Sequence, residues 1–386
     1  MTSPTPRQPR LLMVVNVGWF FVSHRLPIAI AAKQAGYEVH IATALDPQLD
    51  QRTPQLLASH GLILHELQLT RSGTHPLELL RVFRDLVRLF DRVRPAVVHL
   101  VALKPVLLGG MAARLRRLSR VVLAVPGRGS VFSSRGVLPA LRRWMAMRMY
   151  ALAYRSGRSR VIVQNAEDRD YFVQRRVFAH ADVRLIRGSG VNTAEFLPEP
   201  EPSGPVTVVL ASRMLREKGV GDFVAAASAL RKSGVAARFV LVGDPDPGNP
   251  HSHSREELEE WAAQGAVEWW GFRADMQRVF AQSHVVCLPT YYGEGVPKVL
   301  IEAAACARPI VTTNMPGCRD IVHDGHNGLL VAPRDQRALA AALQRLIGDV
   351  QLRREMGQRG RTRAESEFDL NAVIGQTLAI YRELAE

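Results

Sequence analysis

Two short segments in the second half of the chain carry charged residues at spacings that could bind an anionic, hydroxyl-rich ligand. Arg213 and Lys218 stand five residues apart in SRMLREKGV, which follows the apolar run TVVLA. This order predicts a strand-to-helix turn, where backbone N–H groups attract phosphate and two cations can neutralise a diphosphate. The alternative is that both side chains are solvated cations of an ordinary surface loop.

The second segment, residues 291–311 (YYGEGVPKVLIEAAACARPIV), holds two carboxylates. Glu294 stands between two glycines, so a ligand could approach the backbone closely there. Glu302 falls within an expected helix that starts near Pro297, although it could also be a paired carboxylate of the core. Carboxylates accept hydrogen bonds from the paired hydroxyls of a sugar or ribose. With the two cations, they form the set of groups that a nucleotide-diphospho-sugar requires.

Apolar strand patterns alternate with amphipathic helix patterns along the chain, and these elements must position the four groups. Strands are predicted at 11–17, 38–43, 61–67, 96–101, 121–125, 160–163, 183–187, 206–211, 237–242, 266–270, 284–288, 309–312 and 328–331. Helices are predicted at 26–35, 76–93, 105–117, 138–156, 219–232, 254–264, 273–281, 297–306 and 335–347, and throughout 350–386. Near-continuous apolar strands indicate parallel sheets covered on both faces.

The Pro- and Glu-rich segment 196–205 separates two such runs and is the best predicted linker. The pattern therefore predicts an α/β protein with two doubly wound, Rossmann-like domains, 1–195 and 205–365, that face a cleft. Ligands of such sheets bind beyond the carboxyl ends of the strands. Both charged segments follow predicted strands, as this rule requires.

The basic charge is concentrated in the first half of the chain. The whole chain has a net charge of +14, and the stretch 92–160 contains 15 basic residues and no acidic one. An anionic partner is expected. Nucleic acid is disfavoured, because the basic residues are interleaved with helices and strands of a parallel sheet. The basic, amphipathic helix 137–155 favours an anionic membrane surface, although its apolar stripe could equally pack on the sheet.

Three other patterns resemble functional signals but favour simpler explanations. The apolar run 11–22 is too short to span a membrane, and its removal as a signal peptide would discard the first strand. The three cysteines fit neither a disulfide framework nor a metal site, which indicates a reducing, cytosolic location. Residues 244–253 (DPDPGNPHSH) could form a metal site, but a solvated loop is favoured.

The two charged motifs resemble those of the retaining GT-B glycosyltransferases of family 4, also called group 1, which show an Arg-x4-Lys-Gly turn and an E-x7-E element. The resemblance covers nearly the whole chain and includes GVNTAEF (190–196), with Asn192 where Asp is usual, WGFRADM (270–276) and PGCRDIVHDGHNGLLV (316–331). It implies a transferase without metal or cofactor, whose last helix (369–386) packs back on the first domain.

Carried over to this sequence, the resemblance makes Arg213, Lys218 and Glu294 the catalytic set. The two cations would hold the donor diphosphate, and Glu294 would bind the sugar hydroxyls and orient the anomeric centre. Glu302 would bind the ribose. The other donor contacts implied are Gly18, Phe272, Arg273, Gly295, Val296 and Pro297.

The first half resembles a subgroup, the N-acetylhexosaminyl transferases that extend polyprenyl-diphosphate-linked sugars, in VGWFFVSHRLPIA (17–29) and VHLVALKPVLLGG (98–110). The residues implied on the acceptor side are His24, Arg25, His99, Lys104 and Arg128, of which the two histidines could instead be structural. The segment 126–132 lacks the histidine of several members, and the first loop has one glycine where many have two. A front-face reaction needs no such base, because the leaving diphosphate oxygen takes the acceptor proton.

The resemblance thus predicts transfer of a sugar, an N-acetylhexosamine, from a UDP-sugar to a polyprenyl-diphosphate-linked glycan. The pathway expected is assembly of a bacterial surface polysaccharide, such as lipopolysaccharide or capsule, or of a glycoprotein. The protein is expected at the inner face of the cytoplasmic membrane. The alternatives are a glycosyltransferase with a soluble acceptor, a sugar-nucleotide epimerase of the same fold and a binding protein without catalysis.

Overall fold

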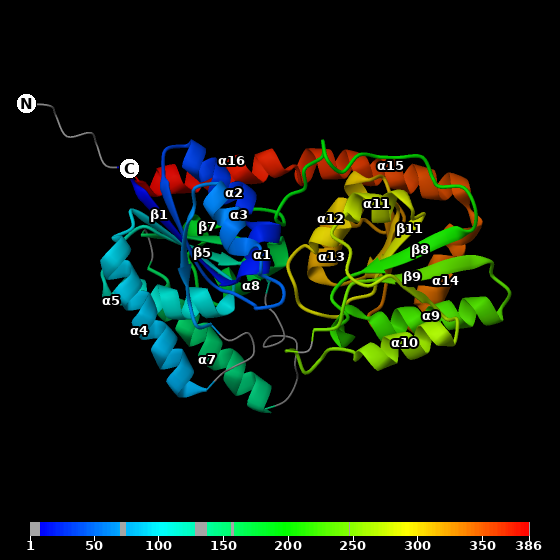
Figure 1. The fold of residues 1–386 in the computed structure, drawn as a ribbon, viewed down its shortest axis with the longest axis horizontal. Coiled ribbons are helices and arrows are strands. Elements are labelled where there is room, and N and C mark those ends of the chain that lie inside the picture. The colour runs from blue at the N-terminus through cyan, green and yellow to red at the C-terminus, as the bar shows by residue number, and fades with distance from the viewer. Residues whose placement is uncertain (1–7, 70–74, 128–136, 156–157, 247, 386) are drawn as a thin grey trace, which may run out of the picture. The chain divides into compact units, whose positions relative to one another are not determined.

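The computed structural model describes residues 8–69, 75–127, 137–155, 158–246 and 248–385, with the backbone alone at 137–139. The chain forms two compact units. Unit 1 contains Met1–Ile186 and Val373–Glu386, and unit 2 contains Arg187–Ala372. Each unit has one parallel sheet with helices on both of its faces (Figure 1).

The sheet of unit 1 has seven parallel strands in the order β3-β2-β1-β4-β5-β6-β7. The strands are β1 (Arg10–Val17), β2 (Glu38–Ala44), β3 (Ile63–Glu66), β4 (Val97–Val101), β5 (Val121–Val125), β6 (Ser159–Val163) and β7 (Val183–Leu185). Leu12 and Val14 of β1 enter the core on one face, and Leu11 and Met13 enter the core on the other. Because both faces are buried, the strands are apolar at nearly every position.

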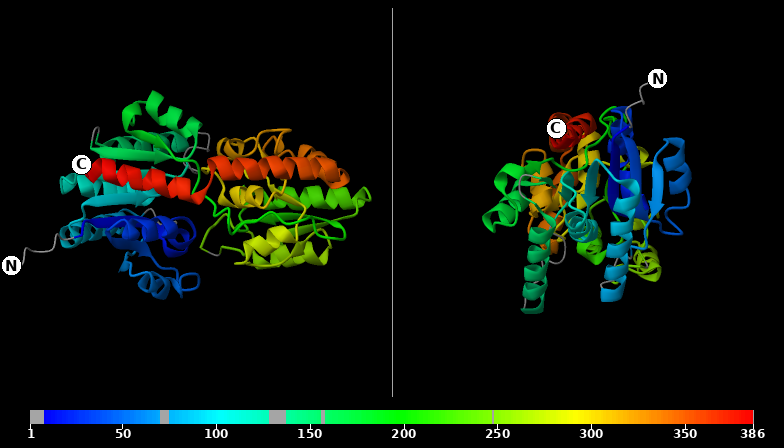
Figure 2. Two further views of the ribbon diagram at one scale, coloured as in Figure 1. Left: turned by 90° about the horizontal axis from the view of Figure 1, so that it is seen from above. Right: turned by 90° about the vertical axis from the view of Figure 1, so that its left-hand side faces the viewer.

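Helices cover both faces of this sheet. On one face lie α4 (Pro76–Val93), the π-helical turn η1 (Pro105–Gly109), α5 (Gly110–Leu115), α7 (Val137–Ala153) and α8 (Ala166–Gln174). On the other lie α1 (Gly18–His24), α2 (Leu26–Gln34), α3 (Thr53–Ser59) and α16 (Leu370–Ala385). A short 3-10 turn, η2 (His180–Asp182), precedes β7. Figure 2 shows α4 and α7 extending past the sheet on the same side of unit 1.

The sheet of unit 2 has six parallel strands in the order β10-β9-β8-β11-β12-β13. They are β8 (Val206–Ala211), β9 (Ala237–Val242), β10 (Glu268–Trp269), β11 (Val285–Leu288), β12 (Ile310–Thr313) and β13 (Gly328–Val331). One face carries α11 (Met276–Ala281), α12 (Lys298–Ala305), α13 (Pro316–Ile321) and α15 (Val350–Glu367). The other carries α9 (Val220–Lys232), α10 (Arg255–Ala263) and α14 (Gln336–Gly348). The 3-10 turn η3 (Arg216–Lys218) precedes α9.

The structure confirms the α/β class, the two doubly wound sheets and every predicted strand, with small shifts at the strand ends. The sequence did not predict α1, α3, α8 and α13. These helices are only six to nine residues long. An amphipathic period has little room to show over so few residues, and the aromatic run of α1 reads equally well as a strand.

The segment 196–205 is not a linker between the units. The boundary falls between Ile186 and Arg187, so the whole segment belongs to unit 2. Three buried arginines hold it: Arg361 donates to the carbonyl of Phe196 at 2.6 Å, Arg308 to that of Pro200 at 3.3 Å, and Arg353 to the carboxylate of Glu201 at 2.7 and 3.0 Å. A Pro-rich composition therefore marked an ordered strap rather than a junction.

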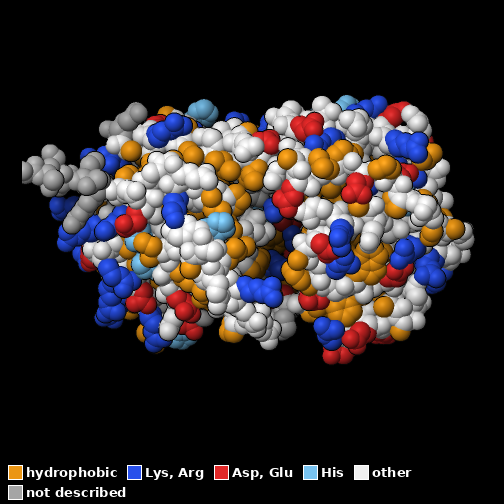
Figure 3. Space-filling view, turned by 45° about the horizontal axis from the view of Figure 1, so that its top comes forward, with side chains coloured by type: hydrophobic (Ala, Val, Ile, Leu, Met, Phe, Trp, Pro, Cys, Tyr) orange, Lys and Arg blue, Asp and Glu red, His pale blue; other side chains and the backbone are white. Residues whose placement is uncertain are grey.

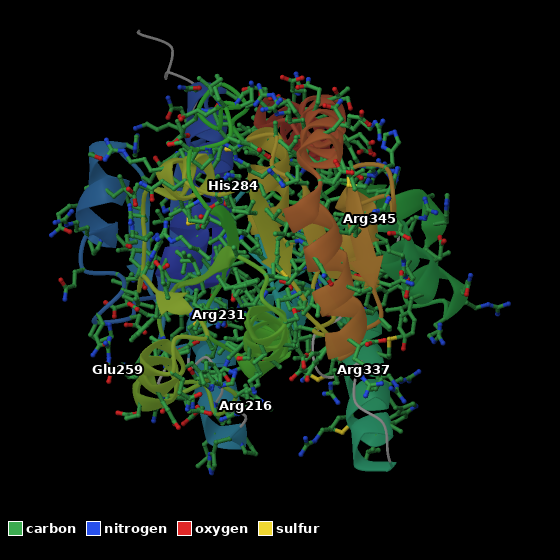
Figure 4. The ribbon with its side chains drawn as sticks, turned by 90° about the vertical axis from the view of Figure 1, so that its right-hand side faces the viewer. Arg216, Arg231, Glu259, His284, Arg337 and Arg345 are labelled. Carbon is green, nitrogen blue, oxygen red and sulfur yellow. The ribbon has the colours of Figure 1, made fainter. Side chains whose placement is uncertain are left out.

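His284 fixes the end of the same strap. Its Nδ1 accepts from the backbone N–H of Thr207 at 3.0 Å, and its Nε2 lies 3.1 Å from the carbonyl of Pro202. The ring is buried beside β11 (labelled in Figure 4). Because one ring nitrogen accepts and the other donates, the imidazole is neutral, and burial lowers its pKa below the ordinary value.

The second boundary falls between Ala372 and Val373, shortly after α16 begins. Four buried side chains of α16 enter the core of unit 1: Val373, Ile380, Tyr381 and Leu384. The last helix therefore completes the core of the unit that contains the first strand, although the chain reaches it from unit 2. No helix among the described residues is both long and apolar enough to cross a membrane.

Candidate functional site

The strand order of unit 2 reverses next to β8. From β8 the chain continues outward to β9 and β10, and then returns to the other side of β8 to form β11. In open α/β sheets, the loops that leave the carboxyl ends of two such strands diverge and form a ligand crevice. Arg213 and Lys218 follow β8, and Glu294 follows β11. Topology alone therefore brings the two charged motifs to the expected place.

An ion pair joins the two motifs. Lys218 Nζ lies 2.8 Å from Glu294 Oε1 and 2.6 Å from Oε2, although the two residues are 76 positions apart. Their side chains are 13% and 21% exposed, so both remain accessible to a ligand. Thr290 donates to the same carboxylate at 3.3 Å. A cation suited to phosphate and a carboxylate suited to hydroxyls thus lie side by side.

Two glycines allow the loops to approach this closely. Gly219 has φ +76°, and a Cβ there would lie 2.2 Å from the carbonyl oxygen of Pro289. Gly317, at the start of α13, touches the loop of Glu294 from the other side, and its Cβ would lie 1.8 Å from the carbonyl oxygen of Gly295. Neither position tolerates a side chain without backbone movement. The sequence motifs therefore include glycines that allow the loops of the candidate site to pack closely.

Arg213 lies in the same turn but has a different partner. Its Nη1 donates to Asp246 Oδ2 at 2.8 Å, where the arginine side chain is 43% exposed and the aspartate 8%. Asp246 belongs to the segment 244–253, whose Asp and His residues resemble a metal site in the sequence. In the part of the chain that the structure describes, no three His, Cys, Asp or Glu side chains are grouped so as to hold a metal ion.

Glu302 is buried in α12 and accepts from Lys298 Nζ at 2.9 Å. Burial raises the pKa of this carboxyl group, and the Lys298 charge opposes that shift. Lys298 is a further charged residue of the candidate site that the sequence motifs did not single out. Its signal was the spacing of four residues to Glu302 on a predicted helix, which places both side chains on one face.

The other predicted donor contacts of unit 2 lie on two loops. Gly295, the buried Val296 and Pro297 form the link from Glu294 into α12, and Pro297 caps that helix. Phe272, on the loop between β10 and α11, is 70% exposed. Its neighbour Arg273 forms two hydrogen bonds with Asp275, at 2.8 and 2.7 Å. The ring of Phe272 is thus exposed to solvent, whereas the guanidinium of Arg273 is paired with Asp275.

The corresponding edge of unit 1 lies beyond β1 and β4, where its strand order also reverses. Gly18 begins α1, and a Cβ there would lie 2.5 Å from Asp50 Oδ1, so a larger residue would require the Asp50 side chain to shift. His24, at the end of α1, stacks on Phe20 with ring centroids 4.2 Å apart. Lys104 follows β4, and partial burial lowers its pKa. Arg128 lies outside the described residues.

Two of the predicted acceptor residues, His99 and Arg25, are buried. His99 is in the middle of β4, is 1% exposed, and its Nδ1 lies 2.5 Å from Tyr381 Oη of α16. Burial lowers the pKa of His99 to about 3. Arg25 is 5% exposed, and burial lowers its pKa to about 10. The alternation of β4 directs His99 beneath α16, where its ring packs against Tyr381, and its predicted acceptor contact stays a prediction.

The fold resembles that of solved glycosyltransferases. The chain matches HepE of Anabaena, solved with UDP, with a TM-score of 0.76 and 19% identity over 97% of this chain and 100% of that one. It matches the sucrose-phosphate synthase of Thermosynechococcus elongatus with a TM-score of 0.78 and 22% identity over 98% and 99% of the two chains. Two parallel sheets covered by helices, matched over nearly the whole chain, give the protein the GT-B fold.

Family comparisons narrow this class. The family model described as "Glycosyl transferases group 1" matches residues 205–349, and that described as "Glycosyl transferase 4-like" matches residues 10–165. The chain belongs to these group 1, or family 4, glycosyltransferases. Among curated relatives, it is 26% identical to the N,N'-diacetylbacillosaminyl-diphospho-undecaprenol alpha-1,3-N-acetylgalactosaminyltransferase of Campylobacter jejuni, over 96% of this chain and 98% of that protein.

Proposed function

We propose that this protein transfers an N-acetylhexosamine from a UDP-sugar to a polyprenyl-diphosphate-linked glycan, with retention of configuration and without a metal or cofactor. The observation that carries the proposal is the Lys218–Glu294 pair where the strand order of unit 2 reverses. UDP in the HepE structure supports the donor nucleotide, and the name of the Campylobacter relative supports a lipid-diphosphate acceptor. The process would be assembly of a bacterial surface polysaccharide or glycoprotein.

The proposed chemistry needs no protein base. The bond between the anomeric carbon and the diphosphate breaks, and its electron pair goes to the phosphate oxygen, which Lys218 and Arg213 stabilise. The acceptor hydroxyl attacks on the same face, and its proton passes to that oxygen as the new C–O bond forms. Glu294 holds the sugar hydroxyls and Glu302 the ribose, so the protein contributes position and charge.

A direct assay tests the activity. Purified protein is given UDP-N-acetylgalactosamine or UDP-N-acetylglucosamine with an undecaprenyl-diphosphate-linked sugar, with and without EDTA, and the anomeric configuration of the product is read by NMR. Transfer with retention that EDTA does not change is expected. An inverted product contradicts the mechanism, and loss of activity that Mn²⁺ restores contradicts metal independence. Equal turnover of a soluble glycoside would favour the soluble-acceptor alternative.

Because a polyprenyl-linked acceptor is anchored in a membrane, we propose that unit 1 lies at the inner face of the cytoplasmic membrane. Large apolar side chains are exposed on both of the helices that extend past the sheet, Leu77 and Leu80 on α4, and Leu141, Trp144 and Met145 on α7. Arginines flank them, among them Arg84 and Arg88 on α4 and Arg142 and Arg148 on α7. On the face in Figure 3, basic side chains gather at one end of unit 1, whereas both signs are interspersed over unit 2.

Vesicle flotation tests the membrane surface. Binding to phosphatidylglycerol vesicles at low salt and release at high salt are expected, because each basic residue near anionic lipid contributes about 1 kcal/mol. The Trp144→Asp/Met145→Asp variant should float poorly, whereas the same change at exposed Val350 of unit 2 should have no effect. Equal binding to neutral vesicles, or full binding by the α7 variant, would contradict this part of the proposal.

A further inference from the structure

The segment 244–253, apart from residue 247, which lies outside the described residues, is folded against the turn that carries Arg213 and Lys218. Ser252 forms an antiparallel bridge with Leu215. The backbone N–H of Arg216 donates to the carbonyl of His251 at 2.9 Å, and that of His253 donates to the carbonyl of Met214 at 2.8 Å. Backbone pairing therefore fixes the position of this loop relative to the candidate diphosphate turn.

The two aspartates of the loop are used at different ends of the candidate site. Asp246 is 8% exposed and accepts from Arg213 Nη1 at 2.8 Å, while its own backbone N–H donates to Ser252 Oγ at 2.8 Å. Asp244 Oδ1 accepts from the backbone N–H of the exposed Phe272 at 3.2 Å. One loop thus contacts both Arg213, the proposed diphosphate ligand, and Phe272, the proposed contact of the base.

The burial of the two partners differs, and this difference indicates which one directs the other. The Arg213 side chain is 43% exposed and long, and an arginine loses up to about 2 kcal/mol of rotamer entropy when it is fixed. Asp246 is short, buried and held by its own backbone contacts. The carboxylate is therefore the fixed partner, and the guanidinium is aligned by it before any ligand arrives.

We propose that Asp246 is a positioning residue, which aligns the guanidinium of Arg213 for the diphosphate of the donor. The inference rests on the proposed function. The inference predicts two opposite effects of the Asp246 carboxylate. It weakens the net positive field that a diphosphate meets, which lowers binding affinity. It also fixes the position of the Arg213 guanidinium when negative charge develops on the leaving group, which favours catalysis. Catalysis gains more from a fixed donor than from an added charge.

A double-mutant cycle tests the inference. The variants are Asp246→Ala, Arg213→Ala and the two together, with Asp246→Glu as a conservative rescue and Asp246→Asn as a milder form. For each, kcat and KM for the UDP-sugar, the Kd of UDP and the Tm are measured. Asp246→Ala should lower kcat about tenfold with little rise in KM, and Asp246→Glu should restore most of the loss. In the Arg213→Ala background, the second change should have no further effect on kcat.

The outcomes separate the inference from the function on which it rests. Equal losses from Asp246→Ala in both backgrounds would mean that Asp246 acts independently of Arg213, and would overturn the inference. Tighter UDP binding with unchanged kcat would also overturn it, because Asp246 would then only neutralise charge. If Arg213→Ala itself left UDP-sugar turnover unchanged, the proposed function would fail together with the inference. Asp246→Asn keeps the side-chain volume, so the cycle remains measurable if the alanine variant unfolds.

Discussion

The two units present their carboxyl-end loops in different ways. In unit 2, three ion pairs tie the charged residues down, Lys218 to Glu294, Arg213 to Asp246, and Lys298 to Glu302. At the same edge of unit 1, the described residues include a glycine, a stacked histidine and a half-buried lysine, while Arg25 and His99 are buried in the core. Unit 2 is thus organised in advance for a small charged ligand. Unit 1 instead exposes apolar side chains on α4 and α7 with arginines beside them, and the membrane surface proposed above depends on these side chains.

The largest expected effect in this comparison comes from breaking the ion pair of unit 2. Lys218→Ala removes the cation at the proposed diphosphate-binding position, and Glu294→Gln removes the carboxylate proposed to accept hydrogen bonds from the sugar hydroxyls. Each should lower kcat by about 100-fold or more, as loss of a charge-stabilising contact typically does. Steady-state kinetics with a UDP-sugar measures this, and the fold, checked by circular dichroism, should remain intact.

Two surface changes serve as matched controls. Lys232→Ala on α9 and Glu259→Gln on α10 (labelled in Figure 4) alter exposed charges of the same kinds in the same unit. Both should retain full turnover. Near wild-type rates in Lys218→Ala or Glu294→Gln would contradict the roles given to this pair.

The next effect concerns the glycine beneath the Glu294 loop. Gly317→Ala would place a Cβ 1.8 Å from the carbonyl oxygen of Gly295, so the loop must move. We expect a loss of about 1–3 kcal/mol in the free energy of unfolding and a larger loss of turnover. Gly221→Ala on α9 is the matched control, since nothing lies within 4 Å of its added Cβ. Unchanged activity in Gly317→Ala would show that the close contact between Gly317 and the Glu294 loop is not needed for turnover.

A smaller effect is expected at the buried carboxylate of α12. Burial raises the pKa of Glu302 and the Lys298 charge lowers it, so Lys298→Met should raise it further. A carboxyl group whose folded pKa lies above its unfolded value stabilises the fold below the unfolded pKa and loses that stabilisation as pH rises through the folded pKa. Urea unfolding should therefore show Lys298→Met weakened more at pH 7 than at pH 4. An equal loss at both pH values would mean that the pair is not coupled.

The last prediction separates packing from function in unit 1 and concerns stability rather than turnover. His99 has a folded pKa of about 3, so between pH 6.5 and pH 3 the unfolded chain binds a proton that the fold excludes. Stability should therefore fall with acidification, by about 1.4 kcal/mol per pH unit for this one residue. His99→Phe should flatten that slope by about one proton, while Tyr381→Phe should keep it. Unchanged pH dependence in His99→Phe would place His99 in contact with solvent.

Much of this arrangement could be predicted from the sequence. Apolar runs such as VVHLV and TVVLA define buried parallel strands, and a strand-to-helix turn locates Arg213 and Lys218 beyond the end of one of them. Spacing could also place Glu302 on a helix. These inferences succeed because they depend on local periodicity and on which end of a strand a residue follows.

What the sequence missed depends on long-range contacts. The pairing of Lys218 with Glu294 spans 76 residues, and the bond from His99 to Tyr381 spans 282. Local periodicity carries no information about such partners. The same limit explains the strap at 196–205, whose Pro-rich composition resembles a linker until the three arginines that hold it are placed. The ion pair of Asp246 with Arg213, 33 positions away, is likewise invisible to local patterns, whereas the Asp and His residues around Asp246 resemble a metal site.

The central claim is that Lys218 and Glu294, where the strand order of unit 2 reverses, hold the diphosphate and sugar of a nucleotide donor. Calorimetric titration of UDP into the wild type, Lys218→Ala and Lys232→Ala tests it directly. UDP should bind the wild type and Lys232→Ala equally, and Lys218→Ala at least tenfold more weakly, since a charged hydrogen bond contributes about 1.5–3 kcal/mol. Equal affinity of all three proteins for UDP, or no binding by the wild type, would contradict the account.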